Sequence, residues 1–106
     1  MGHLIDSASN NHQRFVRASL QDSYEGPGYG ADEWVDLQDY QNQKWVELIV
    51  LWAAYNRHLA HLIARLPEAK AKMPCKIGKS EYTFEWVVTD YVDHMVGHLK
   101  QIGGLE

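Results

Sequence analysis

The chain has 106 residues, of which 45% are hydrophobic and 23% are charged, and its formal net charge is −4. This length suits one domain, residues 1–106, and the composition is that of a globular protein rather than a disordered one. The acidic balance provides no basic surface for nucleic acid or an anionic membrane, so neither is an expected partner. The longest strongly apolar run, Leu48 to Ala54, is far shorter than the roughly 20 residues that span a bilayer, and the N-terminus lacks a signal-peptide pattern. We therefore expect a cytoplasmic protein.

The first segment, from Gly2 to about Gln21, predicts a helix because its apolar residues fall broadly on one side. A polar stripe repeats along the same segment at spacings of four, three and four, so its members share one face. The stripe consists of His3, Ser7, Asn10 and Arg14. A polar face of this kind is either exposed to solvent or the wall of a site, and the residues alone leave both interpretations open.

The next stretch, Asp22 to Asn42, is rich in glycine and proline between Gly26 and Gly30 and then reaches an aromatic residue, Trp34. These residues predict a long ordered loop. Loops of this length are uncommon in compact domains, and many of them cover or wall a functional site.

The middle segment, Trp45 to Leu66, has the clearest helical periodicity, because its apolar residues alternate between spacings of three and four. The seam consists of Trp45, Leu48, Trp52, Tyr55, Leu59, Leu62 and Leu66. Ile49 and Ile63 widen the seam enough to face two neighbouring helices. Pro67 then ends the predicted helix.

The second connection, Glu68 to Tyr82, is predicted to be a turn-rich loop, and its lone Cys75 is interpreted as a structural or incidental thiol. The last helix is predicted to begin after an N-cap at Thr83 and to run to Ile102, before two glycines. The final pair, Leu105-Glu106, resembles an expression-vector remnant and is left out of the functional argument.

Two histidines on the last helix, His94 and His98, are four residues apart and therefore lie on the same face, where both can reach one metal ion. The alternative is a pair of solvated histidines. Both residues border the apolar face of the helix, and a buried imidazole needs a hydrogen-bond partner or a metal. Met95 stands where a zinc protease of the His-Glu-x-x-His type has its glutamate, so that chemistry is not expected.

A third ligand must come from another helix, and four histidines are candidates: His3, His12, His58 and His61. His58 and His61 flank the middle seam beside arginines, which favours a solvent-exposed face for them. His12 is ambiguous in helical phase. His3 heads the polar stripe, for which the two interpretations remain open.

A resemblance to a known family favours His3. The run from Gly2 to Ser7, followed by Asn10 and Arg14-Phe15, resembles the second-helix motif of the DinB-like (YfiT-like) metal-binding four-helix bundles. The segments Tyr91 to His94 and His98 to Ile102 are similar to the final helix of that family. The long loop of that family is similar to the segment that contains Tyr29, Asp32 and Trp34.

The resemblance implies a divalent metal ion, zinc or nickel, bound by His3, His94 and His98. Three imidazoles leave coordination positions open, as in catalytic rather than structural zinc sites. Related enzymes are S-transferases or a maleylpyruvate isomerase that use low-molecular-weight thiols, and others are described as metal-dependent hydrolases. The expected function is therefore thiol-dependent transfer or hydrolysis of a small molecule.

The resemblance also implies an all-α, up-down helical bundle with three main helices in this chain. Family members have a further helix before the motif box, so we expect either a shortened version or a homodimer whose second subunit completes the bundle.

Within the expected site, Asn10 and Arg14 would contact a substrate carboxylate or oxyanion, and Asp90 would orient a ligand imidazole. Asp90 is alternatively a solvated helix charge. The rival hypothesis is a non-catalytic helical interaction protein with a structural or vestigial metal site.

Overall fold

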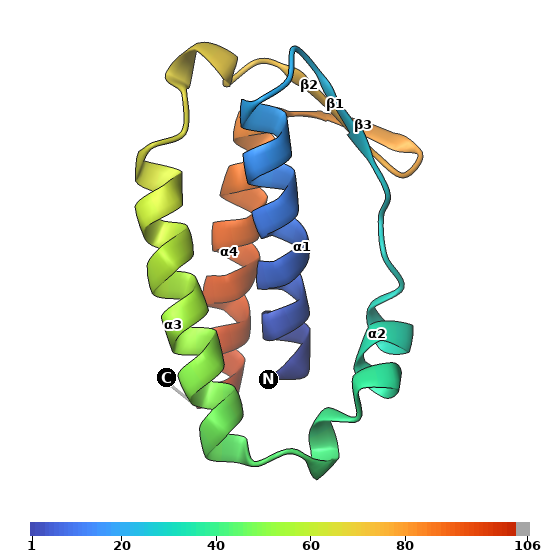
Figure 1. Cartoon of the computed structure of the whole chain (residues 1–106), viewed down its shortest axis with the longest axis vertical. Helices are drawn as coiled ribbons and strands as arrows, with labels where there is room; N and C mark the ends of the chain where they lie inside the picture. The colour runs from blue at the N-terminus through green and yellow to red at the C-terminus, as the bar shows by residue number, and fades with distance from the viewer. Residues whose placement is uncertain (104–106) are drawn as a thin grey trace.

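The computed structural model describes residues 1–103, which form a bundle of three long helices with a small sheet at one end (Figure 1). The long helices are α1 (Gly2–Ser19), α3 (Trp45–Ala64) and α4 (Phe84–Gly103). The short helical elements are α2 (Ala31–Gln38), η1 (Tyr40–Asn42) and η2 (Glu68–Lys70). The strands are β1 (Tyr24–Gly26), β2 (Pro74–Ile77) and β3 (Ser80–Thr83). The predicted vector remnant, Leu105-Glu106, lies outside the described residues.

The three predicted helices are confirmed, and their ends have identifiable causes. The Thr83 hydroxyl accepts a hydrogen bond of 3.2 Å from the backbone N–H of Trp86, so Thr83 is the N-cap of α4 as predicted. The α3 helix ends at Ala64, shortly before the proline that was expected to end it. No helix among the described residues has both the length and the apolar character needed to cross a membrane.

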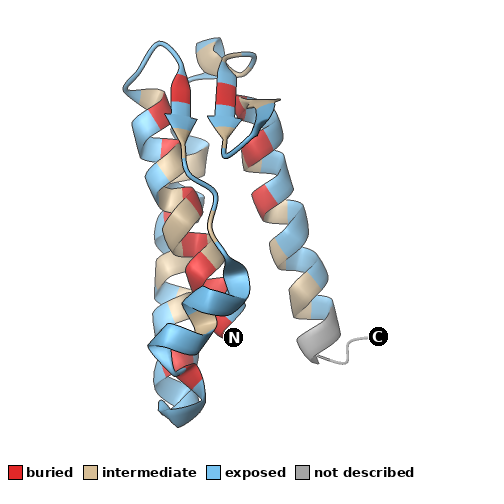
Figure 2. Ribbon diagram, turned by 90° about the vertical axis from the view of Figure 1, so that its right-hand side faces the viewer, coloured by how far each residue is buried: buried red, intermediate tan, exposed pale blue. Residues whose placement is uncertain are grey.

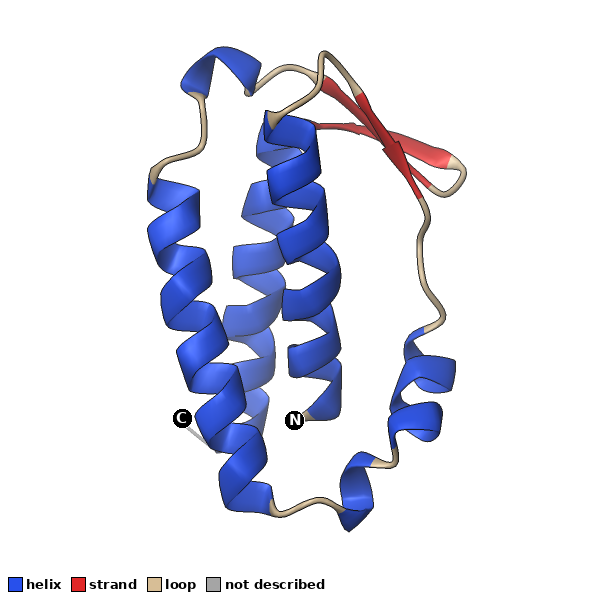
Figure 3. Cartoon of the chain, in the orientation of Figure 1, coloured by secondary structure: helices blue, strands red, loops and turns tan. Residues whose placement is uncertain are grey.

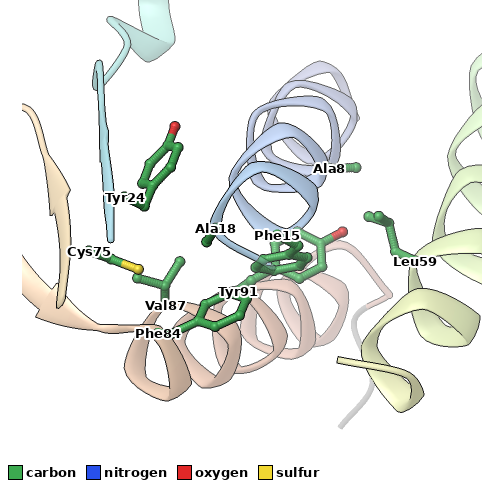
Figure 4. Close-up of a cluster of buried hydrophobic side chains, with 9 residues drawn as sticks. All are labelled: Ala8, Phe15, Ala18, Tyr24, Leu59, Cys75, Phe84, Val87 and Tyr91. Atoms are coloured by element: carbon green, nitrogen blue, oxygen red, sulfur yellow. The ribbon is translucent and has the colours of Figure 1, made fainter. Parts of the chain in front are cut away.

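The core lies where α1 packs against both α3 and α4, and Figure 4 shows its buried side chains. Phe15 of α1 is fully buried, and its ring meets the ring of Tyr91 edge-on at a centroid distance of 5.8 Å. The Tyr91 hydroxyl donates a hydrogen bond of 2.5 Å to Asn56 Oδ1, which links α4 to α3. Burial is the main cause that raises the pKa of Tyr91, to about 12.

The seam of α3 is covered mainly within the chain. Leu59 belongs to the main core, and Leu48 belongs to a second buried cluster together with Ile5 and Tyr40. Figure 2 shows the buried positions concentrated on the inner sides of the helices. The outer side of α3 remains exposed, with Val46 and Val50 at 69% and 61% of their full accessibility.

The sheet corrects the all-α prediction, because the chain is mostly helical but not entirely so. Its strand order is β1-β2-β3, with β1 parallel and β3 antiparallel to β2. Tyr24 pairs with Cys75, which is buried as a structural residue in the core. Gly78 has a φ of 62° in the turn between β2 and β3, a conformation that glycine adopts without strain.

The connection from Asp22 to Asn42 was predicted to be a long ordered loop, and this prediction is wrong in part. The segment contains β1, α2 and η1. It runs from the sheet along the bundle to the start of α3 (Figure 3). Its far end is held on α1 by Tyr40, whose hydroxyl donates a 2.7 Å hydrogen bond to the buried Asp6 carboxylate. Tyr40 packs directly over Gly2, where an added Cβ would lie 2.3 Å from its ring.

Candidate metal centre

Three histidines from the two ends of the chain line one pocket of about 250 Å³. His3 lies in the first turn of α1, whereas His94 and His98 lie in the second half of α4. The two helices pack against each other and run antiparallel (Figure 1), which brings the start of one beside the end of the other. The three residues that the resemblance implies as ligands thus line the same pocket.

The two histidines of α4 lie on one helical face, as their spacing predicts. The ring centroids of His94 and His98 are 5.4 Å apart, with an angle of 52° between the ring planes. His98 is half-buried, and His94 is exposed like His3. All three residues nevertheless line the pocket.

The donor set of the pocket fits a divalent metal ion of the zinc or nickel type, because such ions bind neutral imidazole nitrogens. None of His3, His94 and His98 forms a hydrogen bond to another described residue, so their ring nitrogens are free to bind a ligand. The three imidazoles do not converge on one point, since among the described residues no group of three His, Cys, Asp or Glu side chains is close enough to hold a metal ion. Binding would need rotation of the exposed rings.

The polar stripe of α1 lines pockets along much of its length, and its first member, His3, is also exposed, so the stripe is in contact with both pockets and solvent. Ser7 lines the histidine pocket and also a second pocket of about 180 Å³, which includes Arg14. Asn10 lines a third pocket of about 350 Å³ together with Arg14. None of the three candidate ligands lines this third pocket, so the structure does not bring Asn10 to them.

The second pocket adjoins the histidine pocket, because Ser7, Tyr29 and His94 line both. Its aromatic wall consists of Tyr82 and Trp86, whose rings stack at a centroid distance of 4.2 Å with 8° between their planes. The two pockets therefore form a continuous recess between α1 and α4.

Asp90 lines this second pocket together with His94, and it is exposed. It forms no hydrogen bond to His94 among the contacts of the described residues. The predicted role of Asp90 in orienting a ligand imidazole is therefore not supported by a direct contact. Asp90 does line the same pocket as His94.

Tyr29, which the resemblance placed in the long loop, lines both pockets. It comes from the segment between β1 and α2, packs against Trp34 at a centroid distance of 5.3 Å and lies 5.8 Å below the Arg14 guanidinium. Burial is the main cause that raises the pKa of Tyr29, and the positive charge of Arg14 opposes that shift. Tyr29 is thus held as a neutral hydroxyl at neutral pH.

A buried carboxylate anchors the wall beside His3. Asp6 is only 2% exposed and accepts hydrogen bonds from the Tyr40 hydroxyl and, at 2.8 Å, from Gln38 Nε2. Burial, followed by the bond to Asp6, strongly raises the pKa of Tyr40. Nothing local in the sequence identifies this contact, because its partners are 32 and 34 residues away from Asp6.

The remaining histidine candidates lie elsewhere. His12 Nδ1 and the Tyr55 hydroxyl are joined by a 2.8 Å hydrogen bond, and the His12 and His58 rings meet edge-on at 5.3 Å. Burial first, and His58 second, lower the pKa of His12. His61 is exposed on α3, as its position beside an arginine predicted. None of these three residues lines the histidine pocket.

Comparison of the chain with protein-family models, with curated proteins and with solved structures finds no match.

Proposed function

We propose that this protein is a metal-dependent enzyme of the DinB-like type, in which His3, His94 and His98 bind a zinc or nickel ion. The single observation that supports the proposal is that these three histidines line one pocket, although His3 is more than ninety positions away from the other two in the sequence. The ion would supply Lewis acidity, which lowers the pKa of a bound water or thiol toward neutrality.

The residues of the chain provide the rest of the proposed site. The Arg14 cation is placed to attract a negatively charged group of the substrate, and the neutral Tyr29 hydroxyl can donate a hydrogen bond at the boundary of the two pockets. The apolar lining residues Leu4 and Met95 exclude part of the solvent from the histidines. Such a site fits thiol-dependent S-transfer or hydrolysis of a small molecule, and a cytoplasmic setting, where thiols are kept reduced, belongs to this proposal.

The test is metal binding by the purified protein, measured by titration calorimetry and by elemental analysis after dialysis. We expect one zinc or nickel ion per chain in the wild type and loss of stoichiometric metal in His3→Ala. The matched control is His61→Ala, which removes an exposed histidine from α3 and should leave binding unchanged. Full metal retention by His3→Ala would refute the assignment of His3.

A second candidate function is that of a helical interaction protein with a purely structural metal. The observation that favours it is the exposed apolar surface on α3, which includes Val46 and Val50. Removal of the metal by a chelator distinguishes the two functions. A structural metal would be needed for helicity and for the cooperative thermal transition, whereas a catalytic metal bound to a preformed bundle would leave the far-ultraviolet circular dichroism unchanged.

A further inference from the structure

The second pocket is lined by two opposite charges that form no ion pair with each other in the described structure. Arg14 reaches it from α1 and Asp90 from α4, and both line its volume of about 180 Å³. Among the described residues, the ion pairs are Lys44 with Glu47, Lys72 with Glu85, and Lys76 with Glu25. Arg14 and Asp90 are thus available to charges on a ligand.

Arg14 is held in place by three separate contacts. Its guanidinium lies over the Tyr29 ring and donates hydrogen bonds to Asn11 Oδ1 at 3.5 Å and to the Pro27 carbonyl at 3.4 Å. Asn11 is itself buried and donates a 2.9 Å hydrogen bond to the Ser7 carbonyl. These long bonds to neutral oxygens orient the cation but do not neutralise it, so Arg14 contributes a positive charge to the lining of the pocket.

The size of the pocket suits a small zwitterion. The pocket volume of about 180 Å³ is far above the roughly 10–15 Å³ that a single water molecule needs, so the pocket has room for a small molecule. The α-amino carboxylate group has five non-hydrogen atoms, with a negative charge at one end and a positive charge at the other. Its two charges match a pocket whose lining includes a guanidinium from α1 and a carboxylate from α4.

We propose that the second pocket binds the α-amino carboxylate group of an amino acid or of an amino-acid conjugate. The carboxylate lies on Arg14 and the ammonium on Asp90. Since Ser7, Tyr29 and His94 line both pockets, the remainder of the ligand extends toward the three histidines. Only this last step rests on the proposed metal-dependent function, whereas recognition of the zwitterion does not need the metal.

The test uses metal-free protein and S-methyl-L-cysteine, which has both charges but no free thiol. Binding is measured by titration calorimetry and by NMR shift changes. It is compared with the carboxamide, which lacks the negative charge, and with the N-acetyl derivative, which lacks the positive charge. We expect each derivative to bind about tenfold or more weakly than the parent, the typical effect of losing a charged hydrogen bond.

Two variants test which residue recognises which charge of the ligand. Arg14→Gln should abolish the preference for the parent over the carboxamide, and Asp90→Asn should abolish the preference over the N-acetyl derivative. The matched controls are Arg17→Gln and Asp93→Asn, which remove neighbouring exposed charges that do not line the second pocket. Equal binding of all three compounds, or no binding of any, would overturn the proposal. Metal binding by the same preparations reports separately on the proposed function.

An independent observation concerns the outer face of α3, opposite to α1. Glu47, Val50, Ala54 and Arg57 follow one another at spacings of three, four and three, so they form one exposed stripe. Position 52 is the midpoint of the stripe, and the residues on its two sides lie at equal distances from it in the sequence. Glu47 and Arg57 lie five residues on either side of it and have opposite charges, whereas Val50 and Ala54 lie two residues on either side and are apolar.

We infer that this stripe pairs with the same stripe of a second copy, with the two α3 helices antiparallel. A two-fold axis near position 52 places Glu47 of each copy opposite Arg57 of the other and Val50 opposite Ala54. This arrangement covers the exposed Val50 and provides two intermolecular ion pairs. The contact between Lys44 and Glu47 within one chain is 3.9 Å long and exposed, so it competes only weakly with the intermolecular pair of Glu47 and Arg57.

Sedimentation equilibrium tests the pairing. We expect the wild type to be a dimer, Glu47→Lys to weaken dimerisation tenfold or more, and the charge exchange Glu47→Lys with Arg57→Glu to restore it. The control is Glu81→Lys, which changes an exposed charge on β3. A wild type that is monomeric at all concentrations, or a Glu47→Lys protein that dimerises normally, would overturn this interface.

Discussion

Two histidine clusters lie on opposite sides of α1, and they differ in what surrounds them. His3 and His12 are nine residues apart, which places them about half a turn from each other around the helix. His3 joins His94 and His98 around a pocket, and their ring nitrogens form no hydrogen bond to other residues that the structure describes. His12 instead lies against α3, where it is hydrogen-bonded to Tyr55 and partly buried. The first cluster is available for ligands, whereas the second is part of a helix interface.

A tyrosine supports each cluster in a different way. Tyr40 anchors the far end of the long connection to the buried Asp6, one turn from His3. Tyr55 bonds directly to His12 across the α1 and α3 interface. Two histidines on one helix therefore acquire different properties, because different elements pack against them.

The largest expected effect is on metal affinity. His94→Ala should reduce zinc or nickel affinity by more than about 100-fold, because it removes one of three ligands. His58→Ala, which removes a histidine from the other cluster, should change the affinity by less than about threefold. Competition with a chromophoric chelator measures both affinities. Comparable losses in the two variants would show that the clusters are not functionally distinct.

A smaller effect is expected on stability from Tyr40→Phe. Loss of the hydroxyl leaves the buried Asp6 carboxylate with one donor fewer, so the free energy of unfolding should fall by about 1–3 kcal/mol. Urea denaturation followed by circular dichroism measures the change. The control Tyr82→Phe removes a hydroxyl from a half-buried residue with no hydrogen bond in the described structure, and it should lie near the wild type.

Tyr55→Phe should destabilise the other side of α1 by about 0.5–1.5 kcal/mol, because a single hydrogen bond to a half-buried partner is lost. The same urea experiment measures it. Metal affinity should remain that of the wild type, since Tyr55 does not line the histidine pocket. A loss of metal affinity in this variant would mean that the two sides of α1 are coupled.

The smallest expected effect is a pH dependence that arises from His12. Burial and the neighbouring His58 lower the pKa of His12 below 6.5, so the unfolded chain binds a proton at a higher pH than the folded protein. The contribution of His12 to stability is therefore full above pH 6.5 and is lost as the pH falls through the lowered pKa.

The measurement is the free energy of unfolding between about pH 7 and pH 5. His12→Gln should show a smaller decrease across this window than the wild type, and His61→Gln, which changes an exposed histidine of α3, should retain the wild-type slope. A wild-type slope in His12→Gln would contradict the assignment.

The local features of the chain were predictable. Apolar spacing is a property of neighbouring residues, so the three long helices, the Thr83 cap and the shared face of His94 and His98 follow from the sequence. The sheet was missed because its strands have only three or four residues. The partner of Tyr24, Cys75, lies about fifty positions away. Such short strands are stable only when paired, and that pairing leaves no local pattern.

The sequence by itself therefore determined where the chain is helical and which histidines share a helical face. Only the tertiary structure decided which face of α1 meets which neighbour. His3 and His12 belong to the same helix, yet the antiparallel packing of α1 against α4 places the first beside two further imidazoles, while α3 provides a tyrosine for the second. The physical reason is that helical periodicity depends on residues within two turns, whereas ligand sets depend on contacts between segments far apart in the chain.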